Sequence, residues 1–364
     1  MITSTMWRSY PRILLRDNRK LSAAEAERAR EICQHVGQFV TQRDEYIRAH
    51  GLDPRFCYPD ANWSASANDY FRTVDKVLAA EYDVINRLRL FMVFFSGYSL
   101  RHAARVVGPP SFEEIPADFD AKMESMLKKP DRWVARWMRI ARRVPHDYRF
   151  SPPRMLGEIG WEIDGVVVNH DTYVCQERLN LLYDSGVFDW LSERLAARGT
   201  LRILEIGAGY GALALKIKSL FPASEYWICD LPESLLFSAL YLSLVRPDCP
   251  CGFAQQVRYG FVYMPNYMVS ELRGTFDVAI NTLSFSEMSE HQLRLYAVKL
   301  RELLEGGILF EQNQDNRHVG LLCAEDVLTE YFAFHKRILP ESNWKVTQGA
   351  PNLWANRPMS LLED

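Results

Sequence analysis

From residue 200 onward, short apolar runs alternate with segments whose apolar residues recur at helical spacing. A buried parallel strand reads as a continuous apolar run, whereas a helix shows a period near 3.6 residues. Four runs fit such strands: 201–206, 225–229, 276–281 and 308–311. A looser segment, 249–267, holds a further strand, and 344–348 with 352–355 form a closing hairpin. The alternation predicts an α/β fold on a largely parallel sheet.

The first 150 residues show helical spacing instead. Ser22, with Glu25 three residues later, is a capping box, and the helix that it starts runs to about His50. A second helical stretch covers 69–107, and a third begins near Asp131. Basic residues around the third helix form either a phosphate clamp or a solvated face: Lys128, Lys129, Arg132, Arg136, Arg139 and Arg143.

Residues 151–199 connect the helical part to the first strand of the sheet. Asp171 can cap a helix at 172–183 within this connector. In a fold of this kind the segment before the first strand often lies over the bound ligand. Three polar or aromatic residues there are therefore site candidates: Asn169, His170 and Tyr173.

The charge of the chain changes sign at about the same boundary. Residues 1–150 carry 25 Lys and Arg against 19 Asp and Glu, and the remainder carries 18 against 27. We predict a helical N-terminal domain (1–150) for substrate binding or oligomerisation, a connector (151–199) that caps the cofactor, and an α/β domain (200–364). The acidic balance of the last part argues against nucleic acid as a partner.

Three glycines at every second position follow the first strand: Gly207, Gly209 and Gly211. Glycine lets the backbone turn sharply and approach a ligand, and the next helix presents free N–H groups. The dinucleotide pattern G-x-G-x-x-G has its third glycine one residue later, which disfavours an NAD(P) oxidoreductase. With Glu205 ahead of it, the turn resembles motif I of the class I S-adenosylmethionine (SAM) dependent methyltransferases. The resemblance implies SAM as cofactor, with Glu205 and the loop backbone, Ala208 included, around its methionine part.

An acidic residue, Asp230, ends the second strand. A carboxylate at this place suits a ribose, because it accepts two hydroxyl hydrogen bonds, and we expect the adjacent Leu231 to contact the cofactor as well. Asn281 ends the fourth strand and is a further cofactor candidate. The order of these features resembles one class I methyltransferase domain over about 200–356, which implies a Rossmann-like seven-stranded sheet. Two residues of the third strand are candidates for an adenine contact: Phe261 and Val262.

The segment 281–288, after the fourth strand, bears on the substrate. Methylases of nucleobase amines have an Asn/Asp-Pro-Pro-Tyr/Phe loop at this place, and this segment has no proline, which disfavours DNA methylation and N-methylation. The segment resembles the sugar O-methyltransferases, a family associated with deoxysugars of natural products and with bacterial surface glycans. Four other segments share that resemblance: 168–171, 229–233, 241–243 and 311–313.

A neutral sugar hydroxyl is a poor nucleophile, so a positioned base must take its proton. Glu287 is the first candidate, although a carboxylate at a helix N-terminus is also favoured by the helix dipole. His170 is the second, because imidazole titrates near neutral pH. Ser284 and Asn313 are candidates for hydrogen bonds to the sugar. The alternatives are an O-methyltransferase of a phenolic or polyketide hydroxyl, and a SAM-binding protein without catalysis.

The rest of the composition is typical of a globular cytoplasmic protein. Seven cysteines without paired spacing indicate reduced thiols, and Cys249-Pro250-Cys251 lacks the second pair that a metal site needs. The apolar run 90–95 is too short to span a bilayer, and the first ten residues lack a signal-peptide core. We expect no metal, no membrane span, and a homodimer through the helical N-terminal domain.

Overall fold

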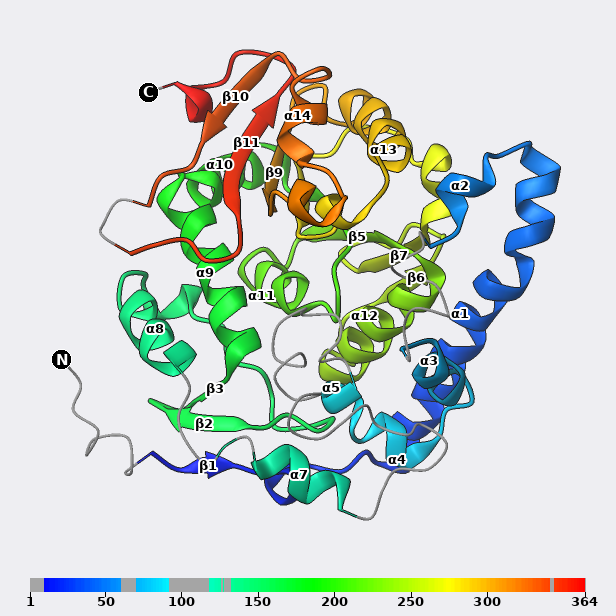
Figure 1. Cartoon of the computed structure of the whole chain (residues 1–364), viewed down its shortest axis with the longest axis vertical. Helices are drawn as coiled ribbons and strands as arrows, with labels where there is room; N and C mark the ends of the chain where they lie inside the picture. The colour runs from blue at the N-terminus through cyan, green and yellow to red at the C-terminus, as the bar shows by residue number, and fades with distance from the viewer. Residues whose placement is uncertain are drawn as a thin grey trace.

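The computed structural model describes residues 10–59, 70–91, 118–125, 127, 132–340 and 344–363. Its centre is an eight-stranded sheet in the order β10-β11-β9-β8-β4-β5-β7-β6 (Figure 1). In that order the strands are Phe334–Arg337, Ala350–Ala355, Ile308–Asn313, Val278–Thr282, Leu201–Ile206, Ser224–Asp230, Phe261–Pro265 and Cys251–Phe253. β11 is antiparallel to both neighbours, and the other neighbouring strands are parallel. The predicted α/β fold is confirmed, with β6 as one strand beyond the predicted seven.

Both faces of the sheet are covered. In β4, Leu201 and Ile203 pack into the core on one face, and Leu204 and Ile206 into the core on the other, because successive side chains alternate. Helices on the two sides are visible in Figure 1. The first face packs against α10 (Val187–Arg198), α11 (Ala212–Leu220) and α12 (Pro232–Val245), and the second against α13 (Glu290–Leu303) and α14 (Ala324–Leu328). Burial on both faces explains why the strands read as continuous apolar runs.

The longest helix, α1 (Ala23–His50), starts and ends as predicted. The Glu25 N–H donates to the Ser22 hydroxyl (3.3 Å), and Gly51, with a φ of +61°, ends the helix. α1 packs along α12, where the buried Arg43 forms an ion pair with Glu233 (2.5 Å). Because Glu233 lies in the first turn of α12, this pair ties α1 to the carboxyl edge of the sheet.

The other helices of the N-terminal region are short. They are α2 (Pro54–Cys57), α3 (Tyr70–Leu78), α4 (Tyr82–Ile85), α5 (Leu88–Phe91), α7 (Phe119–Ser125) and α8 (Arg132–Ala141). The prediction of one helix over 69–107 is wrong for the part of this range that the structure describes, residues 70–91. Ala80 takes a left-handed φ of +53° and Asn86 ends α4, so residues 70–91 form three helices. Residues 92–107 lie outside the described ranges.

The basic helix α8 packs through its apolar side on α9, the helix His170–Asp184. Trp137 and Ile140 are buried, whereas Arg139 and Arg143 are exposed, which favours a solvated face for these arginines. Lys128 and Lys129 lie outside the described residues.

The connector forms a small antiparallel sheet and a helix. β1 (Arg12–Ile13) pairs with β2 (Gly160–Ile163), which pairs with β3 (Val166–Val168). α9 (His170–Asp184) follows, and Asn169 caps it by accepting from the Thr172 N–H (2.9 Å). The prediction that Asp171 caps this helix is wrong, because its carboxylate binds the buried Arg89 (2.7 Å).

The closing hairpin also differs from the prediction. β11 pairs with β10 (Phe334–Arg337), not with 344–348. His335 and Arg337 of β10 are exposed, as befits an edge strand, and such a strand leaves a weak apolar pattern.

Candidate active site

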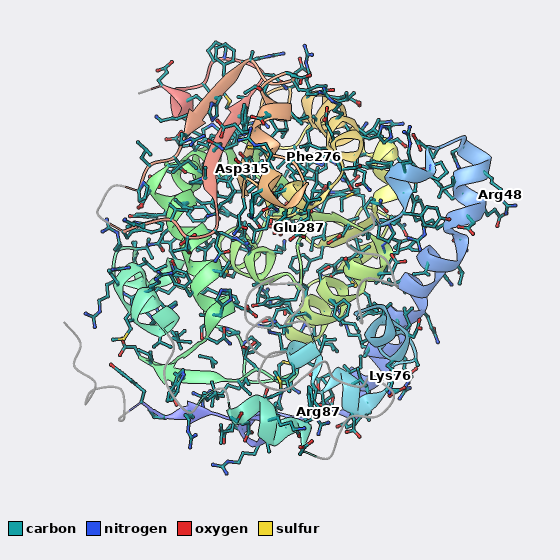
Figure 2. All side chains as sticks on the ribbon, in the orientation of Figure 1. Arg48, Lys76, Arg87, Phe276, Glu287 and Asp315 are labelled. Atoms are coloured by element: carbon teal, nitrogen blue, oxygen red, sulfur yellow. The ribbon has the colours of Figure 1, made fainter. Side chains whose placement is uncertain are left out.

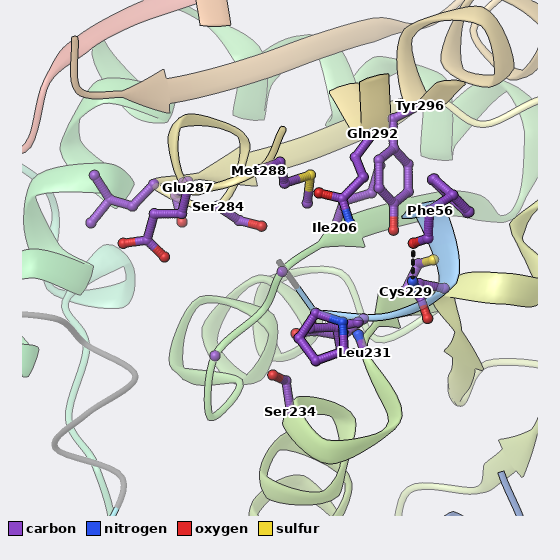
Figure 3. Close-up of a pocket in the computed structure, with 17 residues that line it drawn as sticks. Phe56, Ile206, Cys229, Leu231, Ser234, Ser284, Glu287, Met288, Gln292 and Tyr296 are labelled. Carbon is purple, nitrogen blue, oxygen red and sulfur yellow. Dashed lines mark hydrogen bonds between the residues drawn. The ribbon is translucent and has the colours of Figure 1, made fainter. Parts of the chain in front are cut away.

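A cleft opens at the carboxyl ends of β4, β5, β7 and β8, as in other open α/β sheets. It encloses about 860 Å³, open solvent at its mouth included. Figure 3 shows Leu231 and Ser234 on one side of the cleft, and Ser284 and Glu287 on another.

The glycine turn forms one wall of this cleft. Gly207, Gly209 and Gly211 have φ values of +72°, +57° and +91°, which glycine adopts without strain. A Cβ on Gly207 would lie 2.3 Å from the Ser284 hydroxyl oxygen, so the loop after β8 also requires a glycine there. Gly207 and Gly209 line the cleft, and Ala208 lines a smaller cavity on the α9 side of the turn. Gly211 is the residue from which α11 starts.

Asp230 and Leu231 lie beside the glycine turn and line the same cleft. The Leu231 N–H donates to Asp230 Oδ1 (2.8 Å), which fixes the carboxylate at the end of β5. Burial raises the pKa of Asp230 to about 7. Its carboxylate is therefore placed where a ligand can donate hydroxyl hydrogen bonds to it.

Glu205 lies in β4, in the strand below the turn, and is not among the residues that line the cleft. The Tyr226 hydroxyl donates to it (2.8 Å), and burial raises its pKa to about 7. Its contact with a methionine group stays a prediction.

Asn281 and Asn313 are joined in one buried network that orders the loop after β8. The Asn281 amide donates to the Ile206 carbonyl (2.9 Å) and accepts from the Phe285 N–H (3.1 Å). The Asn313 amide donates to Asn281 (3.0 Å) and accepts from the Ser286 N–H (3.2 Å). Both side chains hold the segment that carries Ser284 and Glu287, and neither lines the cleft.

Glu287 and Ser284 line the cleft together. Glu287 ends a short 3-10 helix, Phe285–Glu287, and lies near the middle of the molecule, far from the peripheral Arg48 (Figure 2). In Figure 3 its carboxyl group projects beside Ser284. The structure thus brings both candidates to one wall.

His170 and Tyr173 lie in α9 and do not line the cleft. His170 is buried, with Nδ1 3.2 Å from a carboxylate oxygen of Asp171. The Tyr173 hydroxyl donates to Glu177 (2.6 Å) and contacts Thr347 (3.0 Å), so it fastens α9 to the loop before β11.

Several cleft residues are absent from the sequence-based candidates. Asn266 follows β7 and donates to the Phe56 carbonyl (2.9 Å), drawn as a dashed line in Figure 3. Tyr296 and Gln292 come from α13. Asn266 directly follows β7, and Asp230 is the last residue of β5, so the position of Asn266 near a strand end was a signal in the sequence. Phe56 reaches the cleft only through the packing of α1 and α2.

The adenine candidates Phe261 and Val262 were wrong. Both are buried inside the sheet at the start of β7, whereas the cleft lies at the opposite end of that strand.

Within the described ranges, no three His, Cys, Asp or Glu side chains gather as metal ligands do. A search of the helices in the same ranges finds none with the length and apolarity needed to traverse a bilayer.

The strand order β7-β5-β4-β8-β9-β11-β10, with β11 antiparallel and a glycine turn after β4, is that of a Rossmann-like, mostly parallel α/β sheet. No protein-family model matches the chain, and no curated protein matches its sequence.

Three solved structures that match about half of the chain show the extent of the likeness. A proposed O-methyltransferase of Nostoc punctiforme shares 9% identity over 48% of this chain and 59% of its own (TM-score 0.33). The bifunctional kinase-methyltransferase WbdD shares 19% identity over 50% of this chain and 40% of its own (TM-score 0.37). The N-methyltransferase NodS of Bradyrhizobium japonicum, in complex with S-adenosyl-L-homocysteine, shares 15% identity over 50% of this chain and 85% of its own (TM-score 0.32). The chain spans less than two thirds of the first two, and the likeness concerns the fold alone.

Proposed function

We propose that this protein is a SAM-dependent O-methyltransferase that acts on a hydroxyl of a sugar, in a natural product or a glycan. The observation that carries the proposal is the composition of one cleft. The glycine turn and Asp230 form one side of it, and Ser284 and Glu287 form the other. A nucleoside-binding half therefore faces a half that has a base and a hydrogen-bonding hydroxyl.

The cofactor half suits the nucleoside part of SAM. Asp230 offers two oxygens to the ribose hydroxyls. Gly207 and Gly209 bring no Cβ between backbone and ligand. Beyond the ribose, Asn266 and Tyr296 line the cleft and supply a polar and an aromatic contact for the base.

When bound, SAM supplies a methyl group already activated by the sulfonium. The protein has to hold a hydroxyl oxygen close to that carbon and remove its proton. Glu287 lines the cleft and is the first choice for this base, with Ser284 beside it as a hydrogen-bond partner of the acceptor. His170 is the second choice and Asn313 a further acceptor contact, each reaching the substrate only through a rearrangement of its present hydrogen bonds.

A sugar is preferred as acceptor because the segment 281–288, which forms this wall, resembles that of the sugar O-methyltransferases. A phenol has a pKa of about 10 and loses its proton more easily than a sugar hydroxyl does. A carboxylate base is therefore needed more for a sugar acceptor than for a phenol.

Glu287→Gln tests the base. We expect turnover to fall roughly 100-fold or more, because general-base catalysis contributes on the order of 10²–10⁴. SAM affinity should stay as in the wild type, since the nucleoside contacts are untouched. Methyl transfer from labelled SAM gives the first quantity, and calorimetry gives the second.

The matched control is Glu290→Gln, which removes an exposed carboxylate three residues further on. Unchanged turnover in Glu287→Gln would eliminate this residue as the base. A panel of sugar and phenolic acceptors separates the two kinds of O-methyltransferase, because transfer confined to phenols would contradict a sugar substrate.

A further inference from the structure

A second cavity lies on the α9 side of the glycine turn. Gly207, Gly209, Thr282 and Leu283 line both this cavity and the main cleft, so the two spaces meet at the turn. The charged side chains that line the second cavity both come from α9: Asp171 and Arg178.

These two charges differ in their partners. The Asp171 carboxylate forms an ion pair with Arg89 (2.7 Å). Within the described residues, Arg178 takes part in no ion pair, and its buried Nε has no hydrogen-bond partner. Burial lowers the pKa of Arg178, as expected for a cation removed from water without a bound anion.

The carboxylates near Arg178 are engaged elsewhere. Glu177 accepts from the N–H groups of Thr347 (3.0 Å) and Gln348 (3.2 Å), and Glu205 accepts from the Tyr226 hydroxyl (2.8 Å). Arg178 is half-buried and its Nε is fully buried, and a charged group withdrawn from water is unfavourable unless an anion pairs with it. Within the described residues, Arg178 therefore presents a cation without an ion-pair partner next to the glycine turn.

We propose that Arg178 binds the carboxylate of the methionine part of SAM, an inference that rests on the proposed function. That carboxylate is the one anionic group of SAM, whose sulfonium and ammonium groups are both positive. With the ribose at Asp230, the amino-acid end of the cofactor would lie along Gly207 and Gly209, which line both spaces. The planar guanidinium matches a carboxylate with two parallel hydrogen bonds.

A carboxylate or phosphate of the acceptor is the other possible source of the anion. Two ligands distinguish the sources: S-adenosylhomocysteine, which has the amino-acid part, and 5′-methylthioadenosine, which has the same nucleoside without it. Their affinities are measured by calorimetry for the wild type, Arg178→Met, and Arg139→Met. The last removes an exposed arginine of the neighbouring α8 and is the control for net charge.

We expect Arg178→Met to weaken S-adenosylhomocysteine roughly 10- to 100-fold, as the loss of a charge-assisted hydrogen-bonded pair does. The affinity for 5′-methylthioadenosine should stay the same, and Arg139→Met should affect neither ligand. Unfolding of the ligand-free Arg178→Met protein in urea should need as much denaturant as the wild type or more, because the variant removes a half-buried charge whose Nε has no hydrogen-bond partner.

Equal losses for both ligands, or none for either, would overturn the assignment of Arg178. Reduced methyl transfer with unchanged affinity for S-adenosylhomocysteine would overturn it as well, because the arginine would then serve the acceptor. A wild type that binds neither ligand would instead refute the proposed function.

Discussion

Three carboxyl groups at the carboxyl edge of the sheet have pKa values raised to about 7, because burial disfavours their charged form: Glu205, Asp230 and Glu311. Asp230 faces the cleft, whereas Glu205 and Glu311 bind protein donors. The same edge of the sheet thus contains one carboxyl group that lines the cleft and two that are bound by protein donors.

The raised pKa of Glu205 predicts a pH dependence of stability. Its folded value, about 7, lies above the ordinary 4.5, so the folded protein binds more protons than the unfolded chain between these values. The stabilisation is therefore complete below pH 4.5 and is lost as the pH rises to 7. Glu205→Gln removes this loss.

Urea unfolding of both proteins from pH 5 to 7.5 measures the effect. We expect the free energy of unfolding of the variant, relative to that of the wild type, to rise by about 2 kcal/mol from the lower to the higher pH, since each pKa unit corresponds to about 1.4 kcal/mol. A difference that does not change with pH would contradict a buried, protonated Glu205.

Among single residues, the sequence predicted some of those that line the two cavities and missed others. Asp230 and the glycines were predictable because a parallel sheet puts its ligands at the strand ends. Asn281 also lies at a strand end, but its amide nitrogen donates to the Ile206 carbonyl and its amide oxygen accepts from the Phe285 N–H. Arg178 lies within a helix far from the turn in sequence, and only the packing of α9 reveals it.

Among the elements, the turn between β4 and α11 and the loop after β8 depend on each other. A Cβ on Gly207 would meet the Ser284 oxygen at 2.3 Å and its Cβ at 2.4 Å, whereas a Cβ on Gly209 would meet no atom within 4 Å. Both glycines have a positive φ, so the two positions differ only in the room that the structure leaves for a Cβ.

We expect Gly209→Ala to lower the free energy of unfolding by about 1 kcal/mol, the cost of a left-handed alanine. Gly207→Ala should cost about 1 to 3 kcal/mol more, because the Ser284 loop must shift. Urea unfolding of the two variants checks this. Equal losses would show that the turn and the loop are independent.

Element prediction succeeded where local signals were strong. The capped α1 and the buried strands β4, β5, β8 and β9 have both a regular pattern and clear boundaries. β10 was missed because its exposed residues lack such a pattern, and the helix expected over 69–107 was too long because Ala80 in a left-handed conformation has no signature in the sequence.

For the whole molecule, the helical region contributes residues to both hydrophobic cores that cover the faces of the sheet. Residues of α1 such as Val36 pack in the same cluster as Leu240 of α12, and α2 brings Phe56 to the cleft. Although the net charge changes sign near residue 150, the parts of the chain before and after this point do not have separate hydrophobic cores within the described residues. The boundaries at 150 and 199 and the dimer remain predictions.

The central claim is that the cleft beside the glycine turn binds SAM through Asp230. Calorimetry of S-adenosylhomocysteine with the wild type, Asp230→Ala and Asp248→Ala tests it most directly, the last removing an exposed aspartate as control. We predict one site in the wild type and in Asp248→Ala, and an affinity roughly 100-fold lower in Asp230→Ala, because two hydrogen bonds to a carboxylate are lost. No binding by the wild type, or undiminished binding by Asp230→Ala, would contradict the account.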